Sequence, residues 1–326
     1  MASAGLPFLL AAAAWACSAT LASGLHRTRE VALATAIDED KLERPLKVFT
    51  IFDRAYTRIA KVWRDCLTEA ISGPLDGLSV EATEVPAQRP APPQRETRFP
   101  PSSLSRLLVN EWATKLATSD TLHIDADAFL LKDPVRGTTL KYPEADIIAA
   151  VDCVHDRPAC SWYRSREYLQ RNNYRDPLEA QGFMLNTGFM YLRSSPATID
   201  LLNRAISLTN EGENEQVALN SVLLRLGCAW TLANGSRAPR GPAALDHLQG
   251  DTLHGRCNSS ISSPEQPQPL LRVVVLPYSN VPRGEDVQYH RGTVMPLSLA
   301  YHPGGGLEHK EQLLGHVRHM CMAKRQ

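Results

Sequence analysis

The sequence has no excess of charge of either sign. Its 326 residues include 35 Lys and Arg and 35 Asp and Glu, so the formal net charge is zero. A protein that binds nucleic acid usually carries a basic excess, and no nucleic-acid partner is therefore expected. Apolar residues make up 43% and charged residues 21%, which is ordinary for a soluble globular protein. The length allows one large domain or two small ones, with a sizeable core either way.

Charge is also missing from the N-terminus, where Met1–Gly24 has no charged side chain. The apolar run over residues 6–17 has the length of a signal-peptide core, and the small residues 22–24 suit cleavage. An uncleaved anchor is an alternative, because the uncharged run is about long enough to span a bilayer. Arg27 and Arg29 follow the run, which argues against an anchor that leaves the C-terminal domain in the lumen. The segment could also be an organelle transit peptide, or the result of a misassigned start codon.

We expect residues 1–24 to be a signal peptide or N-terminal anchor, residues 25–45 a stem, and residues 46–320 the main domain. The protein would associate with a membrane only if the N-terminal segment is an uncleaved anchor.

No two cysteines have the C-x-x-C spacing, so a zinc site is not expected. An even number of cysteines follows the leader, which fits a compartment where disulfides form. They are Cys66, Cys153, Cys160, Cys228, Cys257 and Cys321. Cys153 and Cys160 bracket a short loop and could pair. Glycosylation sequons at Asn234 and Asn258 agree with the secretory pathway, in the lumen of the Golgi or endoplasmic reticulum.

Strand-like and helical segments alternate along the chain, with no internal repeat. The strands are expected at residues 46–53, 121–124, 145–151, 188–193 and 271–277, and the helices at residues 56–71, 102–117, 196–210 and 215–227. The proline-rich residues 85–101 are expected to form a surface loop, and residues 306–326 a basic helix or tail. This order predicts an α/β fold with a mostly parallel sheet covered by helices on both faces.

Two aspartates, Asp125 and Asp127, follow the strand over residues 121–124. Ligands of open α/β sheets gather at the carboxyl ends of strands. On extended backbone, residues two apart point to the same side, so both carboxylates can reach one cation. Their mutual repulsion would raise a pKa unless a cation holds them, and Mg²⁺ or Mn²⁺ is the expected occupant. Alternatively, one aspartate caps a turn and the other faces solvent.

The segment LHIDADAFLLKDP (122–134) resembles the metal-binding D-x-D segment of GT-A nucleotide-diphospho-sugar transferases, near glycosyltransferase family 77 and more distantly family 8. Three further segments follow in the family's order. MLNTGFMYLRSSPAT (184–198) resembles the N-T-G-F segment, NEQVALN (214–220) the D-Q-x-x-x-N segment, and YHPGGGLEHK (301–310) the C-terminal segment. The resemblance implies a GT-A fold with a Rossmann-like sheet, in which residues 46–320 form the glycosyltransferase domain.

The resemblance also implies ligands for the metal and the diphosphate. His302 would join Asp125 and Asp127 as the third metal ligand, although a lone histidine is more often structural. Gly305, in a run of three glycines, would let the backbone approach the diphosphate. Lys310 would place a positive charge on the leaving diphosphate, and its alternative is a solvated helix lysine.

Further roles around the donor follow from the same resemblance. Asn186 would hydrogen-bond sugar hydroxyls, or else simply favour a turn. Glu215 and Gln216 would face the donor sugar or the acceptor as catalytic residues, with Lys310. The family usually has aspartate where this chain has Glu215, which alters the place of the carboxylate.

The donor contacts of Thr50, Asp53 and Arg106 rest on analogy. Thr50 and Asp53, at the end of the first strand, would hold the base and ribose. Arg106, on the helix before the D-x-D strand, would touch the donor. Asp152 would contact the sugar or cap a turn.

The acceptor is expected to contact the polar, aromatic and basic segment Cys153–Phe183. Trp162 and Tyr163 suit sugar stacking, and the alternative for this segment is a variable surface loop.

The function implied is metal-dependent transfer of a sugar from a nucleotide diphosphate sugar to a glycan or glycoprotein, with retention of anomeric configuration. Two alternatives stay open. A haloacid-dehalogenase-type phosphatase would use Asp125 as nucleophile and Asp127 as acid. A GT-A-like module could instead bind a sugar nucleotide or glycan without catalysis.

Overall fold

The computed structural model describes residues 41–71, 76–86, 103–154, 180–211, 213–238, 250–258, 270–282, 298–303 and 306–322. The predicted signal peptide or anchor and most of the predicted stem lie outside these ranges, as do Trp162, Tyr163 and Gly305. Residues from Leu42 onward belong to one unit, which is described below. In the described ranges, every helix is too short or too polar to span a bilayer.

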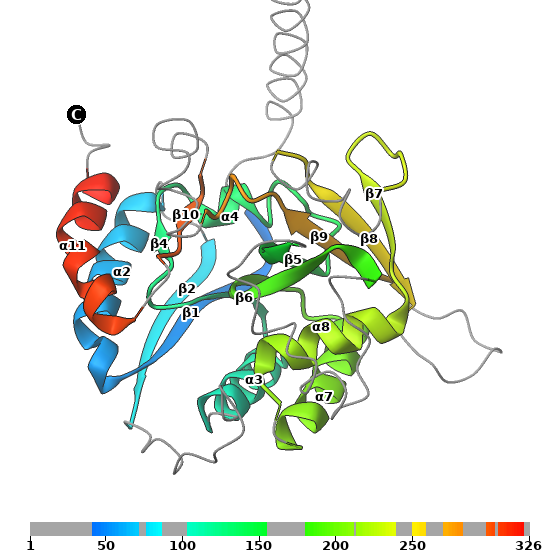
Figure 1. The fold of residues 1–326 in the computed structure, drawn as a ribbon, viewed down its shortest axis with the longest axis horizontal. Helices are drawn as coiled ribbons and strands as arrows, with labels where there is room; N and C mark the ends of the chain where they lie inside the picture. Colours follow the sequence, from blue (N-terminus) through cyan, green and yellow to red (C-terminus); the bar gives the residue numbers. More distant parts are fainter. Residues whose placement is uncertain are drawn as a thin grey trace, which may run out of the picture. The chain divides into compact units, whose positions relative to one another are not determined.

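A mixed sheet forms the centre of this unit, with the strand order β2-β1-β3-β6-β5-β9-β8-β7 (Figure 1). The strands are β1 (Lys41–Asp53), β2 (Asp76–Val85), β3 (Asp120–Ile124), β5 (Ile147–Val154), β6 (Phe183–Leu192), β7 (Ala229–Leu232), β8 (Leu253–Asn258) and β9 (Leu270–Leu276). β1 is parallel to β3, and β5 to β9. β6 and β8 run antiparallel to both of their neighbours. Among the seven strands other than β2, five therefore share one direction, which confirms the mostly parallel sheet.

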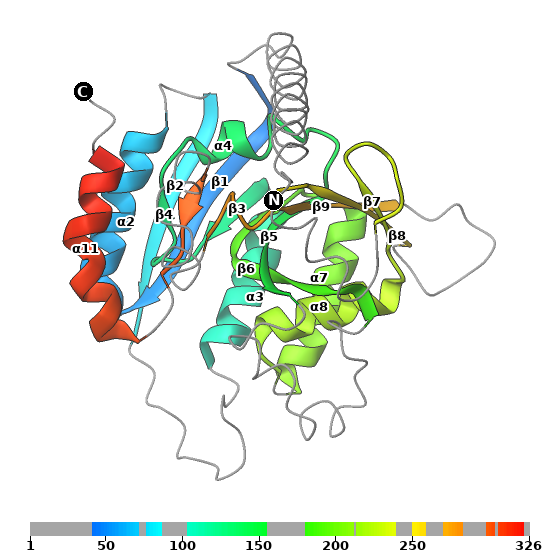
Figure 2. The same ribbon diagram turned by 45° about the horizontal axis from the view of Figure 1, so that its top comes forward.

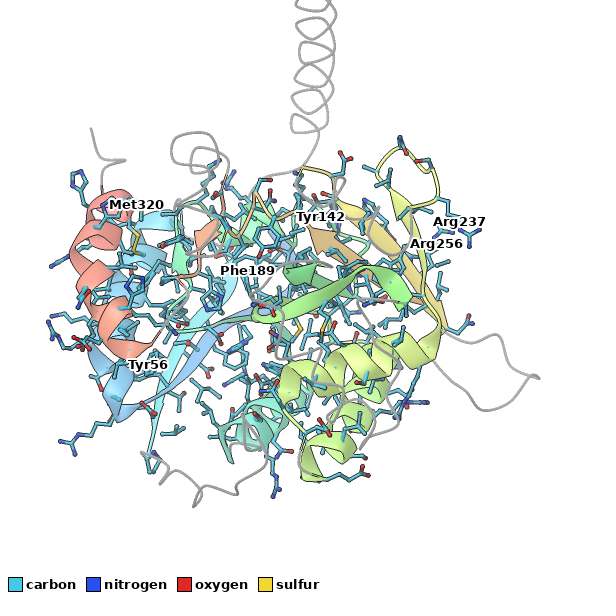
Figure 3. All side chains as sticks on the ribbon, viewed as in Figure 1. Tyr56, Tyr142, Phe189, Arg237, Arg256 and Met320 are labelled. Carbon is cyan, nitrogen blue, oxygen red and sulfur yellow. A yellow bond between two sulfur atoms is a disulfide. The ribbon has the colours of Figure 1, made fainter. Side chains whose placement is uncertain are left out.

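Helices cover both faces of the sheet, as predicted (Figure 2). One face packs on α3 (Ser103–Leu116), α7 (Pro196–Asn210) and α8 (Glu215–Leu226), and the other on α2 (Thr57–Ala70) and α11 (Leu307–Met322). Alternate residues of β5 divide between the two cores, with Ala149 on the α3 side and Ile148 on the α2 side. Side chains fill both layers, among them the fully buried Phe189 (Figure 3).

Two smaller elements connect the strands to the site. A 3₁₀ turn, η1 (Arg54–Tyr56), follows β1, and the short helix α4 (Pro134–Gly137) follows the aspartate pair. A two-stranded antiparallel sheet pairs β4 (Phe129–Leu130) with β10 (Ala300–Tyr301).

Several element boundaries differ from those predicted. β1 begins at Lys41, inside the predicted stem. β6 begins at Phe183, so Asn186 lies inside a strand, and the prediction that it precedes the strand is wrong. The helix predicted to stop at Gly227 does so, because Gly227 takes the left-handed conformation (φ 67°).

Two disulfides join distant parts of the unit. Cys66–Cys321 links α2 to α11, and Cys228–Cys257 links the end of α8 to β8. The expectation of disulfides is confirmed for these four cysteines. The proposed Cys153–Cys160 pair lies outside the described side chains.

Candidate active site

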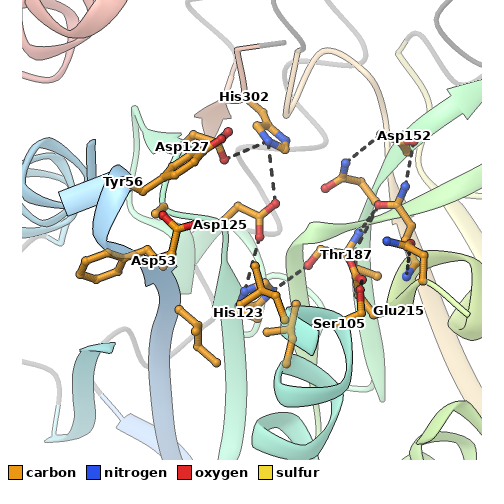
Figure 4. Close-up of a pocket in the computed structure, with 18 of the residues that line it drawn as sticks. Asp53, Tyr56, Ser105, His123, Asp125, Asp127, Asp152, Thr187, Glu215 and His302 are labelled. Carbon is orange, nitrogen blue, oxygen red and sulfur yellow. Dashed lines mark hydrogen bonds and ion pairs between the residues drawn. The ribbon is translucent and has the colours of Figure 1, made fainter. Parts of the chain in front are cut away.

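A cavity of about 450 Å³ opens at the carboxyl end of β3, where the aspartate pair lies (Figure 4). Asp125 follows the last residue of β3, and its backbone N–H donates to the Gly188 carbonyl at 2.7 Å. The Ala128 N–H donates to the Asp125 carbonyl at 2.8 Å, which closes a turn around the pair. The strand end and this turn therefore direct both carboxylates into one cavity.

His302 reaches the same cavity from a distant part of the sequence. Ala300 and Tyr301 pair with Leu130 and Phe129 in the small β4–β10 sheet. This pairing places the next residue, His302, over the two carboxylates. Its Nε2 lies 3.2 Å from Asp127 Oδ1 and 3.9 Å from Asp125 Oδ2.

The three residues suit a divalent cation. One ligand atom from each of Asp125, Asp127 and His302 lies within 4.8 Å of the others. Two carboxylates and one imidazole form a donor set that binds Mn²⁺ and related metals. Burial would raise the pKa of Asp127, but His302 and Lys310 hold it below its ordinary value, so the carboxylate is ionised and ready to coordinate. The sequence-predicted ligands are thus brought together.

Lys310, in the first turn of α11, closes this side of the cavity. Its ammonium group contacts the Asp127 carboxylate, and its Nζ lies 3.4 Å from the Tyr56 hydroxyl. Burial opposes the charge on Lys310, but Asp127 and Tyr56 outweigh it and raise the pKa of the lysine. Burial is also the main cause that raises the pKa of Tyr56. Lys310 is therefore not the solvated helix lysine of the alternative interpretation.

A network of amides forms the opposite wall. Asp152 accepts from Asn186 Nδ2 at 2.9 Å on one oxygen and from Gln216 Nε2 at 3.0 Å on the other. The amide oxygen of Gln216 accepts from the Thr187 N–H at 3.0 Å, and that of Asn186 from the Gly188 N–H at 2.7 Å. Each amide is therefore held in one orientation, with Asp152 as the shared anchor.

Glu215 enters the cavity from the start of α8, a helix capped by Asn214. Ser105 on α3 donates a hydrogen bond to the Glu215 carboxylate. Burial raises the pKa of Glu215, and the serine only partly opposes that shift. The longer glutamate, where the resembling family usually has aspartate, is therefore directed onto α3.

His123 lies beside Asp125 in the wall of the cavity. The ring is fully buried and packs near Phe49 and Trp112. Its Nδ1 lies 2.8 Å from the Thr187 carbonyl oxygen, so Nδ1 carries the proton, and Nε2 faces Asp125 Oδ1 at 3.5 Å. Burial lowers the pKa of His123.

Two residues placed by analogy do not line the cavity. Thr50 is completely buried in β1, and the Arg106 Nε donates to the Thr209 carbonyl at 3.1 Å. Asp53 does line the cavity, and its Oδ1 also accepts from the Ala55 N–H. Several lining residues were not predicted from sequence, among them Tyr56, Ser105, His123 and Thr187. Of these, His123 had a signal, because it lies near the end of β3, two residues before Asp125.

Comparison with known proteins gives one family match. Residues 119–249 match the model of the nucleotide-diphospho-sugar transferases. No curated protein matches the chain.

Similar solved structures include a glycosyltransferase involved in the glycosylation of the major capsid of PBCV-1, at 11% identity and a TM-score of 0.44, covering 83% of this chain and 98% of that one. A galactosyltransferase, LgtC, in complex with donor and acceptor sugar analogues, has 11% identity and a TM-score of 0.42. The match covers 83% of this chain and 95% of that one. The apo form of GlyE from Streptococcus pneumoniae TIGR4 has 12% sequence identity and a TM-score of 0.40. The match covers 88% of this chain and 64% of that one. The family match spans the aspartate pair and the N-T-G-F and E-Q segments, and it confirms that this chain resembles the nucleotide-diphospho-sugar transferases.

Proposed function

We propose that the protein transfers a sugar from a nucleotide diphosphate sugar to a glycan or glycoprotein acceptor, with Mn²⁺ or Mg²⁺ as cofactor. The observation that carries the proposal is the convergence of Asp125, Asp127 and His302 in a cavity that Lys310 also lines. A divalent metal held there, when bound, would supply positive charge toward a diphosphate.

The residues around this group suit the other parts of a donor. Tyr56 and Phe52 give the cavity aromatic side chains beside Asp53, which suits stacking on a base and a hydrogen bond to a ribose. Lys310 would balance the charge that develops on the leaving diphosphate. Asn186 donates one amide N–H to Asp152 and has a second, which can donate to a sugar hydroxyl.

The network also bears on the proposed retention of configuration. The amide oxygen of Gln216 already accepts from the Thr187 N–H, and its nitrogen donates to Asp152. Gln216 is therefore better suited to positioning the sugar than to nucleophilic attack. This supports attack by the acceptor on the face that the diphosphate leaves, with Glu215 and Gln216 orienting the two sugars.

A donor screen tests the proposal. The purified full-length protein is offered a panel of nucleotide sugars with Mn²⁺, and released nucleoside diphosphate is measured. We expect one donor to be hydrolysed only with metal, and a loss of at least about 1,000-fold in the double variant Asp125→Ala/Asp127→Ala. No hydrolysis together with no metal-dependent nucleotide binding would refute the metal-dependent transferase. Release of phosphate from a phosphate ester, in the absence of any nucleotide sugar, would instead indicate a phosphatase.

We also propose that the reaction takes place in the lumen of the secretory pathway. The two disulfides and the uncharged, apolar N-terminus support this location. Asn234 lies exposed in the turn after β7, and its Oδ1 accepts from the Ser236 hydroxyl at 2.7 Å. We therefore expect the chain, expressed in eukaryotic cells, to carry a glycan at Asn234. A mass loss on glycosidase treatment that is the same in the wild type and in Asn234→Gln would count against the modification and weaken the location.

A further inference from the structure

Lys310 forms an ion pair with one oxygen of Asp127, one of the three candidate metal ligands. The ammonium group contacts Asp127 Oδ2, while Asp127 Oδ1 faces His302 Nε2 at 3.2 Å. The exposed fraction is 13% for the Lys310 side chain and 8% for Asp127, so solvent screens this ion pair only weakly. A cation that binds at Asp127 therefore meets a fixed positive charge in direct contact with the same carboxylate.

The position of this charge is well fixed. The Lys310 Nζ lies 3.4 Å from the Tyr56 hydroxyl and 5.5 Å from the centre of the Tyr56 ring. The Lys310 N–H donates to the Gly306 carbonyl at 3.2 Å, and the disulfide to Cys66 ties the far end of α11 to α2. These contacts hold the first turn of α11 and the ammonium group next to Asp127.

The net charge of the site depends on Lys310. Asp125 and Asp127 contribute two negative charges, and Lys310 one positive charge. A divalent metal alone would leave this group with one net positive charge, whereas without the lysine the same group would be neutral. The diphosphate of a nucleotide sugar brings about two negative charges, which make the combination of metal and lysine favourable.

We propose that Lys310 makes metal binding at Asp125, Asp127 and His302 depend on the diphosphate of the donor. This inference rests on the proposed function. The free protein holds a divalent metal weakly, and metal and diphosphate each strengthen the binding of the other, because coupling between two ligands is reciprocal. Lys310 is in this view a residue that sets the order of assembly, in addition to any contact with the leaving group.

The test is the affinity of the full-length protein for Mn²⁺ alone, measured from the electron paramagnetic resonance signal of free Mn²⁺. Lys310→Met removes the charge and keeps most of the side-chain length. We expect this variant to bind Mn²⁺ roughly tenfold more tightly than the wild type, because a nearby like charge is gone. Adding Asp127→Asn to Lys310→Met should abolish the tighter binding. That result would place the bound Mn²⁺ at the Asp125, Asp127 and His302 group.

Arg318→Met is the matched control. Arg318 lies on the same helix and pairs with Asp65 at 3.7 Å, about 12 Å along the axis from Lys310. Its loss should leave the Mn²⁺ affinity unchanged. Lys310→Gln is measured in parallel, with a thermal melt of each variant, so that the result does not depend on the folding of one protein.

Equal or weaker Mn²⁺ binding by folded Lys310→Met and Lys310→Gln would overturn the inference. If the wild type still hydrolyses a donor with metal, the proposed function stands and only the role of Lys310 fails. If instead no donor is hydrolysed or bound, the proposed function fails on its own experiment, whatever the lysine variants show.

Discussion

Gly188→Ala is expected to lower donor hydrolysis by about 100-fold or more while the chain still folds. A Cβ atom at this position would lie 2.2 Å from Asp125 Oδ2 and 2.7 Å from Asp125 Cγ. The backbone there cannot retreat easily, because the Gly188 carbonyl accepts from the Asp125 N–H and the Gly188 N–H donates to Asn186. The carboxylate must therefore turn away, and a displacement of about 1 Å in an active site can cost about 100-fold in rate.

A glycine outside the cavity provides the control for Gly188. Gly315 lies exposed on α11, and no atom would lie within 4 Å of a Cβ atom there. Gly315→Ala should leave hydrolysis unchanged and stabilise the protein by roughly 0.5–1 kcal/mol, since alanine favours helix. Rates and thermal melts are compared for both variants. Full activity in Gly188→Ala would show that the Asp125 carboxylate has another place in the working enzyme.

Loss of the Cys66–Cys321 disulfide should destabilise the protein more than loss of Cys228–Cys257. The first closes a loop with a sequence separation of 255 and the second one of 29. Loop-closure entropy gives about 5.5 kcal/mol for the longer loop and about 3.5 kcal/mol for the shorter one. The first pair also holds α11 against α2, and α11 carries Lys310. We therefore expect its loss to reduce donor hydrolysis as well.

The measurement is a thermal melt under non-reducing conditions of Cys66→Ala/Cys321→Ala and Cys228→Ala/Cys257→Ala. The Cys66 variant should melt at the lower temperature. The reverse order would mean that strain or packing at these sites outweighs the difference in loop length.

Much of the fold could be predicted because its central elements have strong patterns. The strand of residues 121–124 is a continuous run of buried side chains, and α7 begins and ends at the predicted residues. β2 was missed because most of its side chains are exposed, and β7 because it has only four residues. Neither provides the alternation or the apolar run that marks a strand.

The site was predictable where neighbours along the chain carry the chemistry. Asp125 and Asp127 share one strand end, and His302 and Lys310 lie in one recognisable segment. Residues that enter through packing could not be found this way. Ser105 matters because α3 lies against the start of α8, and no sequence spacing records that contact. Arg106, the next residue along α3, was chosen by analogy and contacts a carbonyl instead.

The link between Cys66 and Cys321 also constrains how the chain matures. At a synthesis rate of about 5–20 residues per second, Cys321, at a sequence separation of 255, appears on the order of tens of seconds after Cys66. Cys228 and Cys257 emerge during this interval, and each is a wrong partner for the waiting Cys66 thiol. Correct pairing thus requires either that α2 shelters Cys66 early or that a disulfide isomerase corrects premature bonds.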